Sequence, residues 1–145
     1  MRLTSFTDFG LRALMRMASA PDRAFSTAEI ADEFGVSRHH LTKIIQRLAR
    51  HGIVATRRGT GGGAMLARDA AEIGLGEIVR LLEHDQSLVE CFAADGVCSV
   101  FPVCRLKGKL QAAEKTFLAE LDRSTLADIA LPAQIPVRAA AGVAS

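Results

Sequence analysis

Two helix signals separated by a glycine turn constrain the fold of this chain most. Ser26 is a good N-cap residue and Glu29 follows three positions later, as in a capping box, so a short helix is expected to start here. Gly35 ends it, because glycine tolerates the left-handed turn. Ser37 then caps a longer helix over residues 38–51. A short helix, a tight turn and a second helix predict a helix-turn-helix.

A glycine-rich hairpin is expected directly after the second helix. Residues 53–55 have the composition of a strand, residues 57–63 form a tip with four glycines, and residues 65–66 begin the return strand. Such a hairpin is the wing of a winged helix. The glycines could instead cradle a phosphate-bearing cofactor, but no Gly-Lys-Ser/Thr follows them and no helix opens directly after them.

The helix over residues 38–51 has one apolar face and one basic face. Its inward positions are Leu41, Ile44, Ile45 and Leu48. In a helix-turn-helix the first turn of the second helix meets base edges, and Arg in the wing can enter a narrow minor groove. The candidate DNA-binding residues are therefore Ser37, Arg38, His39, His40, Thr42 and Lys43 on the helix, and Arg57, Arg58 and Gly59 on the wing. The alternatives are a solvated histidine in the helix and a solvated hairpin.

The charge of the chain is unevenly distributed. Residues 1–68 carry 11 Lys/Arg and 5 Asp/Glu, whereas residues 69–145 carry 7 Lys/Arg and 11 Asp/Glu. A basic first half and an acidic second half are expected if only the first half meets phosphate. Double-stranded DNA is the partner that this distribution favours.

The second half is expected to supply a loop and a long helix. A helix ends near Glu83, a loop covers residues 84–104, and an amphipathic helix follows over residues 105–123. Burying the apolar face of that helix calls for a twin from a second subunit. The expected division is a DNA-binding domain (1–83), the loop (84–104), a dimerisation region (105–130) and a disordered tail (131–145). The fold class is mainly α, with a small β hairpin.

Three cysteines occur in this loop and nowhere else. Cys91, Cys98 and Cys104 are an odd number of thiols, so a closed disulfide framework would leave one over, and a structural zinc site wants four ligands. The trio suits an iron–sulfur cluster with a fourth ligand from elsewhere, for which His84, Glu90 and Asp95 are nearby candidates. The alternatives are a zinc site and a reversible disulfide between the last two cysteines.

Composition narrows the setting and the function classes. No apolar run is long enough to span a bilayer, and no signal-peptide core follows Met1, so we expect a cytoplasmic protein with no membrane partner. No Ser/His/Asp constellation, dinucleotide fingerprint or paired acid and base stands out, which argues against an enzyme. An electron carrier is the alternative from a different class.

Four segments in the same order carry a resemblance to a known family. They are the opening Met1-Arg2-Leu3-Thr4-Ser5-Phe6-Thr7-Asp8-Phe9-Gly10-Leu11-Arg12-Ala13-Leu14, then Val36-Ser37-Arg38-His39-His40-Leu41-Thr42-Lys43-Ile44-Ile45, the wing Arg58-Gly59-Thr60-Gly61-Gly62, and Cys104-Arg105-Leu106-Lys107. Together they resemble the NsrR-type nitric-oxide-sensing repressors, members of a winged-helix group that also includes IscR.

The resemblance implies a homodimer that binds palindromic promoter DNA and responds to nitric oxide. It also implies an iron–sulfur cluster on the three cysteines: a 4Fe–4S cluster whose fourth ligand is Asp8 of the partner subunit, with a 2Fe–2S cluster as the alternative. IscR uses a His three positions after its last Cys, and that position here is Lys107. Arg12 lies one helical turn after Asp8 and is expected to support its carboxylate.

Overall fold

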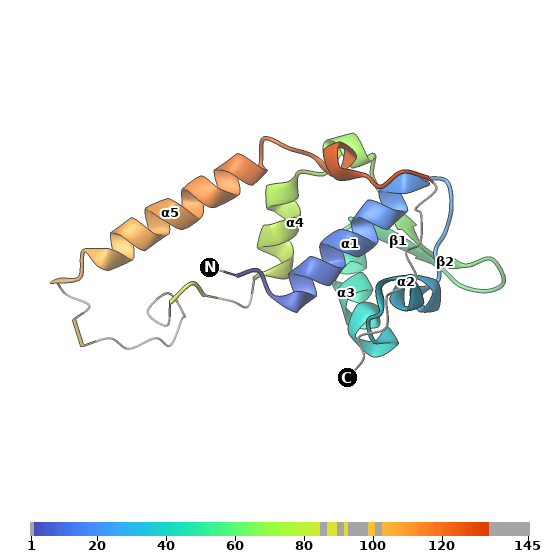
Figure 1. The fold of residues 1–145 in the computed structure, drawn as a ribbon, viewed down its shortest axis with the longest axis horizontal. Coiled ribbons are helices and arrows are strands. Elements are labelled where there is room, and N and C mark those ends of the chain that lie inside the picture. Colours follow the sequence, from blue (N-terminus) through green and yellow to red (C-terminus); the bar gives the residue numbers. More distant parts are fainter. Residues whose placement is uncertain (1, 85–86, 90–91, 93–98, 101–102, 134–145) are drawn as a thin grey trace, which may run out of the picture.

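The computed structural model describes residues 2–84, 87–89, 92, 99–100 and 103–133. The fold is mainly helical with one two-stranded antiparallel sheet, which confirms the predicted class (Figure 1). The elements are α1 (Ser5–Ser19), α2 (Thr27–Phe34), α3 (Arg38–Arg50), β1 (Val54–Arg57), β2 (Gly63–Leu66), the 3₁₀ helix η1 (Ala70–Glu72), α4 (Leu75–Leu82), α5 (Leu106–Leu121) and the 3₁₀ helix η4 (Leu126–Ile129).

Local signals fix the ends of the first three helices. The side chains of Thr4, Ser26 and Ser37 each accept a hydrogen bond from the backbone N–H three residues on, at 3.3, 3.0 and 3.0 Å. Gly35 has φ +66°, the left-handed conformation that closes α2 and starts the tight turn into α3. The predicted helix-turn-helix is confirmed.

One hydrophobic core lies between α1, α3, α4 and the hairpin. The inward face predicted for α3 is buried as expected. Gly10 lets α1 approach both α3 and α4, because a Cβ at this position would lie 2.5 Å from Leu82 Cδ1 and 3.2 Å from Ile44 Cγ2. The largest wholly buried apolar side chains are Leu14, Met17, Phe25, Ile30, Leu41, Ile44, Leu48, Ile53, Ile73, Ile78 and Leu126.

The hairpin is attached to the connection between α1 and α2. β1 and β2 pair from Val54 opposite Leu66 to Arg57 opposite Gly63. Phe25 extends the ladder, since its backbone exchanges two hydrogen bonds with Ala64 at 2.8 and 2.7 Å. The approach is so close that a Cβ on Gly63 would lie 2.4 Å from the carbonyl oxygen of Phe25.

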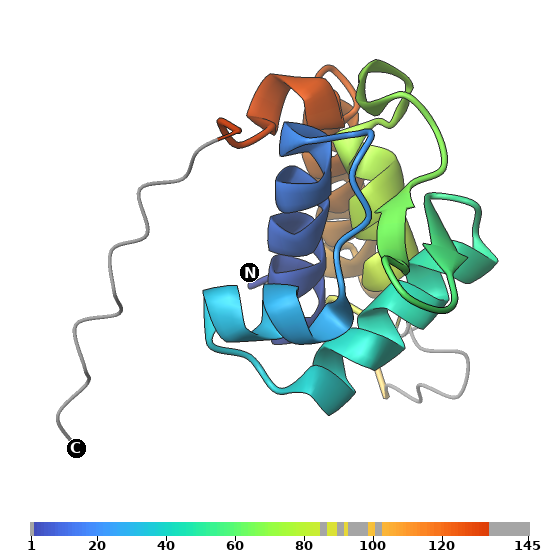
Figure 2. The same ribbon diagram turned by 90° about the vertical axis from the view of Figure 1, so that its right-hand side faces the viewer.

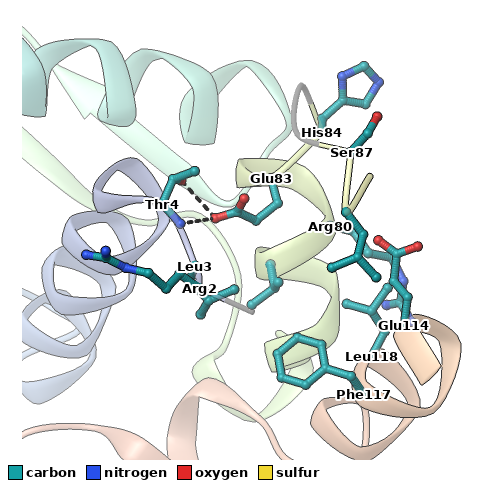
Figure 3. A pocket seen from close by; sticks show the side chains of 12 residues that line it. Arg2, Leu3, Thr4, Arg80, Glu83, His84, Ser87, Glu114, Phe117 and Leu118 are labelled. Atoms are coloured by element: carbon teal, nitrogen blue, oxygen red, sulfur yellow. Dashed lines mark hydrogen bonds between the residues drawn. The ribbon is translucent and has the colours of Figure 1, made fainter. Parts of the chain in front are cut away.

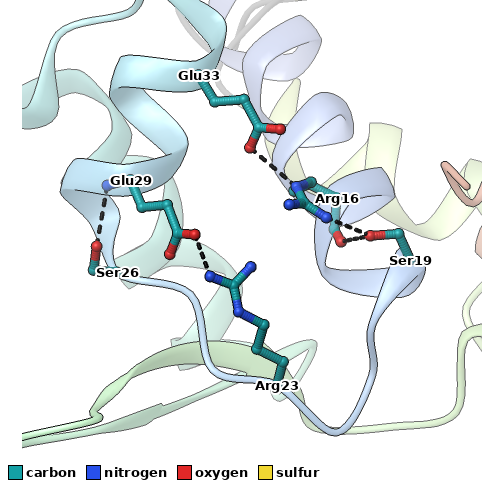
Figure 4. A network of polar contacts seen from close by, with 6 residues as sticks. All are labelled: Arg16, Ser19, Arg23, Ser26, Glu29 and Glu33. Atoms are coloured by element: carbon teal, nitrogen blue, oxygen red, sulfur yellow. Dashed lines mark hydrogen bonds and ion pairs between the residues drawn. The ribbon is translucent and has the colours of Figure 1, made fainter. Parts of the chain in front are cut away.

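A polar network ties α1 to α2 (Figure 4). Arg16 of α1 pairs with Glu33 of α2 at 3.0 Å, and both side chains are largely buried, with 14% and 16% of their surfaces exposed. Arg23 pairs with Glu29. The guanidinium groups of Arg16 and Arg23 lie 4.8 and 4.3 Å from the centre of the Phe25 ring, so two cations contact this aromatic side chain.

The long helix α5 extends away from α1, α2 and α3 (Figure 1). All residues of α5 are described, and none is buried. Its C-terminal end is held at α4, where the Arg80 guanidinium bonds both carboxylate oxygens of Asp122 at 2.8 and 2.5 Å. The chain then returns to the domain, and Leu126 of η4 is wholly buried in the core.

Two expectations fall partly or wholly outside the described residues: the positions of two of the three cysteines, and residues 134–145 of the expected tail. None of the described helices has the length and apolar character needed to cross a bilayer.

Candidate nucleic-acid interface

The N-terminal end of α3 presents polar and cationic side chains to the surface. Ser37 caps the helix, and Arg38, His39 and Lys43 are exposed. Arg38 lies 3.3 Å from an oxygen of Asp32 in a pair that is mostly solvated, with 65% and 69% of the side chains exposed. Solvated pairs of this kind are weak, so a phosphate or a base can take the guanidinium from Asp32 at little cost.

Thr42 and His40 are less accessible than these three side chains. The Thr42 hydroxyl donates a hydrogen bond to the backbone carbonyl of Arg38 at 2.7 Å, and the side chain is half-buried. The His40 ring lies against α1, with its centroid 5.8 Å from that of Phe6 and 5.5 Å from that of Phe9. The structure therefore brings the two adjacent histidines into different surroundings.

The wing carries two exposed arginines beside α3. Arg57 ends β1 and Arg58 begins the tip, where Gly59 has φ +94° and allows the chain to turn. Figure 2 shows the hairpin and α3 on the same side of the domain. We call five exposed residues of the helix and the wing the reading surface: Arg38, His39, Lys43, Arg57 and Arg58. The three arginines and the lysine carry positive charge, which favours binding to phosphate.

Asp8 and Arg12, predicted from the opening segment, meet on the exposed side of α1. The Arg12 guanidinium bonds the two oxygens of the Asp8 carboxylate at 3.1 and 3.0 Å. About half of each side chain is exposed. Arg12 also lies 5.9 Å from the centre of the Phe9 ring. The carboxylate is thus oriented by its neighbour and remains open to a partner from outside the chain.

Cys104 is half-buried just before α5 begins. Cys91 and Cys98, and the alternative ligands Glu90 and Asp95, lie outside the described residues, and His84 is exposed after α4. Among the residues that the structure describes, no three His, Cys, Asp or Glu side chains gather as a metal site would require. Three thiols are soft donors of the kind that hold iron–sulfur clusters, whereas a carboxylate is a hard donor that would complete such a set only as a weaker fourth ligand.

An open hollow of about 450 Å³ separates the N-terminal segment from α4 and α5 (Figure 3). Glu83 lies in its wall and accepts hydrogen bonds from Thr4, the residue that caps α1. The contact links the start of α1, which carries Asp8, with the end of α4, which precedes the cysteine segment. Sequence reasoning missed it, since no local signal joins residues so far apart. The lining also includes Arg2, Leu3, Val79, Arg80, His84, Ser87, Leu88, Glu114, Phe117 and Leu118.

A capped cationic helix beside a basic, glycine-tipped hairpin defines a winged-helix DNA-binding protein. The chain belongs to the Rrf2 family: the family model, described as an iron-dependent transcriptional regulator, matches residues 3–131. Membership confirms the expectation of a transcriptional regulator and not an enzyme.

Solved structures share this fold along nearly the whole chain. T. potens IscR is 28% identical, with a TM-score of 0.69 over 89% of this chain and 85% of that one. B. subtilis CymR, titled the global cysteine regulator, is 27% identical, with a TM-score of 0.67 over 90% and 96% of the two chains. The oxidized form of Staphylococcus aureus CymR is 23% identical, with a TM-score of 0.70 over 93% and 100%, a likeness that concerns the fold alone.

Proposed function

We propose that this protein is an iron–sulfur cluster-dependent repressor of transcription, which binds palindromic promoter DNA as a homodimer in the cytoplasm and loses DNA affinity when nitric oxide damages the cluster. The observation that carries the proposal is the combination, in one short chain, of a cationic reading surface and a trio of cysteines placed just before a long exposed helix.

The reading surface supports sequence-specific DNA binding. Arg38, His39 and Lys43 lie at the exposed end of α3, where side chains can reach base edges in the major groove. Arg57 and Arg58 are exposed at the end of β1 and the start of the hairpin tip, a place from which wing arginines can enter an adjacent minor groove. Ser37 adds a capped helix end, whose backbone amides favour a phosphate.

The exposed apolar side chains of α5 support a homodimer. Leu106 is 62% exposed at the start of the helix, and Leu110, Phe117 and Leu121 are only half-buried. A single domain leaves this face in water, whereas a second copy would cover it. A two-fold pair of winged helices reads a palindrome, because each recognition helix takes one half-site.

Four residues that would hold an iron–sulfur cluster support the sensing part of the proposal. Cys91, Cys98 and Cys104 would hold it through thiolates, with Asp8 of the partner subunit as the fourth ligand. When bound, an iron–sulfur cluster supplies iron sites that react with nitric oxide. The protein would contribute in two ways. The Arg12 guanidinium, 3.0 Å from an oxygen of the Asp8 carboxylate, orients that carboxylate, and Cys104 is placed two residues before the start of α5.

A second candidate is an iron- or redox-responsive regulator with the same DNA-binding architecture. The iron-dependent description of the family favours it, and so does the similarity to B. subtilis CymR, a cysteine regulator. Lys107 occupies the position where IscR-type ligation uses a histidine, which argues against that particular ligand set.

Anaerobic purification followed by iron and sulfide assays tests the cluster. The chain has no Trp and no Tyr, so the protein part absorbs almost nothing near 280 nm and cluster bands stand out. We expect a brown protein whose colour is lost in Cys91→Ala, Cys98→Ala and Cys104→Ala and kept in the control Ser99→Ala. A colourless protein that contains zinc would contradict the proposal.

Operator binding with and without nitric oxide separates the two candidates. The first predicts that stoichiometric nitric oxide releases the DNA, whereas mild thiol oxidation or iron chelation on the same timescale does not. The reverse order of sensitivity would favour the second candidate.

A further inference from the structure

The two histidines in the first turns of α3 differ in what they touch. His39 is exposed, whereas His40 is half-buried and its ring lies against two phenylalanines of α1, Phe6 and Phe9. The Phe9 contact is edge-on, with an interplanar angle of 85°, and the Phe6 contact is tilted at 43°. Edge-to-face rings at such distances attract each other beyond simple burial.

This contact continues the packing of α1 against α3 toward the DNA-binding end. Deeper in the core, Gly10 lets α1 approach Ile44 closely. The Arg47 guanidinium of α3 also lies at this junction, 4.7 Å from the Phe6 ring centre. His40 therefore adds a contact with α1 in the first turn of α3, next to the exposed side chains of Arg38 and His39.

His40 and Ile44 lie one turn apart on α3, and both face α1. Two contacts with α1 along the helix constrain the direction of α3 as well as its distance from α1. The backbone N–H of His40 is also the group that bonds the Ser37 cap, at 3.0 Å. His40 thus contacts the cap of α3 through its backbone and α1 through its ring.

We propose that His40 is a positioning residue, which sets the angle of α3 on the DNA through its ring, and that His39 with Arg38 and Lys43 reads the bases. This inference rests on the proposed role of α3 as the recognition helix. It divides two neighbouring histidines by function: one contacts DNA and the other contacts α1.

The two roles leave different patterns in DNA binding. Removing a reader relaxes the preference at one base pair of the half-site and leaves the others intact. Removing a positioning residue shifts every contact of the helix together, so specific affinity falls evenly across the half-site. Binding that depends only on phosphate charge should change little in either case.

Binding of the full-length protein to an operator selected from random duplexes, and to a panel of single-base variants of it, tests the division. We expect His39→Ala to weaken binding about 5- to 100-fold with the loss concentrated at one position. His40→Ala should weaken it about 5- to 10-fold, evenly over the half-site, with binding to non-specific duplex unchanged. His40→Phe, which keeps a ring and removes both nitrogens, should restore affinity to within about threefold and keep the base preference.

The outcome that overturns the inference is a His40→Phe protein that is folded by circular dichroism yet has lost preference at a single base pair. If that variant fails to fold, the pair Phe9→Leu and His40→Ala decides: each should give the same even loss, and the double variant should lose little more than either alone. Additive losses would show that His40 and Phe9 do not act through their mutual contact, and would refute the inference. If His39→Ala and Lys43→Ala both leave operator binding unchanged, the proposed role of α3 fails instead, which is a separate result.

Discussion

Glu83, the C-cap residue of α4, accepts two hydrogen bonds from Thr4 through one carboxylate oxygen. The backbone N–H of Thr4 donates at 2.7 Å and its hydroxyl at 2.8 Å (Figure 3). The same hydroxyl oxygen accepts the backbone N–H of Thr7 at 3.3 Å, so the carboxylate, the cap and the first turn of α1 form one chain of bonds. This network sets the start of α1 against the end of α4.

Replacing the carboxylate of Glu83 with an amide is therefore expected to cost stability. Glu83→Gln keeps the shape and one acceptor oxygen but loses the charge, and charge-assisted bonds are about twice as strong as neutral ones. We expect the free energy of unfolding to fall by about 1 kcal/mol in urea at fixed protein concentration. The control Glu72→Gln, at an exposed position in η1, should stay within about 0.5 kcal/mol of the parent. Equal values for the two variants would show that the Thr4 contact contributes nothing.

A methyl group on Gly10 is expected to separate α1 from its neighbours. The new Cβ of Gly10→Ala would lie 2.5 Å from Leu82 Cδ1 and 3.2 Å from Ile44 Cγ2, and both side chains are buried. Overpacking a core position typically costs about 1–3 kcal/mol, which exceeds the gain in helix propensity.

Gly108→Ala is the matched control for Gly10→Ala. Gly108 also lies inside a helix, α5, but an added Cβ there has no neighbouring atom within 4 Å. It should stabilise the protein by about 0.5–1 kcal/mol, the ordinary difference between alanine and glycine in a helix. A Gly10→Ala protein as stable as the parent would mean that the helices are not in such close contact.

Local signals made much of this fold predictable, and long-range contacts account for what the sequence left open. Ser26, Ser37 and Gly35 each act within one turn of the chain, so their roles can be read from their neighbours. The Thr4–Glu83 contact cannot, since it depends on where α4 ends relative to α1.

His40 is a residue of the candidate site whose surroundings could not be predicted from the sequence. Helical periodicity places it in the first turn of the recognition helix, beside the expected DNA contacts. Its ring nevertheless lies on Phe6 and Phe9, because Gly10 brings α1 and α3 close together. Leu126 is a comparable case: it lies after the predicted long helix, and it is buried in the core where the chain returns beyond the Arg80–Asp122 pair at the end of α5.

The Arg80–Asp122 pair is expected to make stability depend on pH at the acid end. The guanidinium hydrogen bonds hold the pKa of Asp122 below its usual value, against a smaller opposing effect of desolvation. The ionised carboxylate is thus favoured in the folded state, so the contribution is complete above the unfolded pKa of about 4 and is lost as pH falls through the lower folded value.

Thermal unfolding between pH 3 and 7 checks this sign. Asp122→Asn should melt below the parent at pH 7, and the difference should shrink as pH falls below about 4. Added salt should reduce it at neutral pH, because the pair is solvent-exposed. The control Glu120→Gln, which removes the open pair with Arg123, should show a smaller difference at pH 7. A gap between Asp122→Asn and the parent that persists unchanged at pH 3 would exclude the carboxylate as its cause.

Two ion pairs in this chain should differ in energetic weight. The Arg16–Glu33 pair (Figure 4) is largely buried, and its guanidinium lies over the Phe25 ring, whereas the side chains of Arg123 and Glu120 are 76% and 70% exposed. Arg16→Gln leaves Glu33 with an uncompensated charge and removes a cation from the Phe25 ring, so we expect a loss of about 2–3 kcal/mol. Arg123→Gln should change stability by less than about 0.5 kcal/mol, which urea unfolding would resolve. Similar values for both would mean that solvent reaches the first pair.

The wing arginines should contribute to DNA affinity through phosphate charge or minor-groove potential. Each phosphate contact releases condensed counterions, so log K falls linearly with log salt, with a slope of about −0.9 per contact. Arg57→Gln and Arg58→Gln should each reduce the magnitude of that slope by about 1 if the hairpin lies on the backbone. Arg123→Gln, which removes the same charge at the end of α5, should leave the salt slope unchanged.

If instead a wing arginine occupies a narrow minor groove, its loss should weaken binding to operators with A·T-rich flanks more than to those with G·C-rich flanks. Two wing variants that match the parent in slope and in flank preference would place the hairpin off the DNA, and the base contacts of α3 would then have to supply the affinity alone.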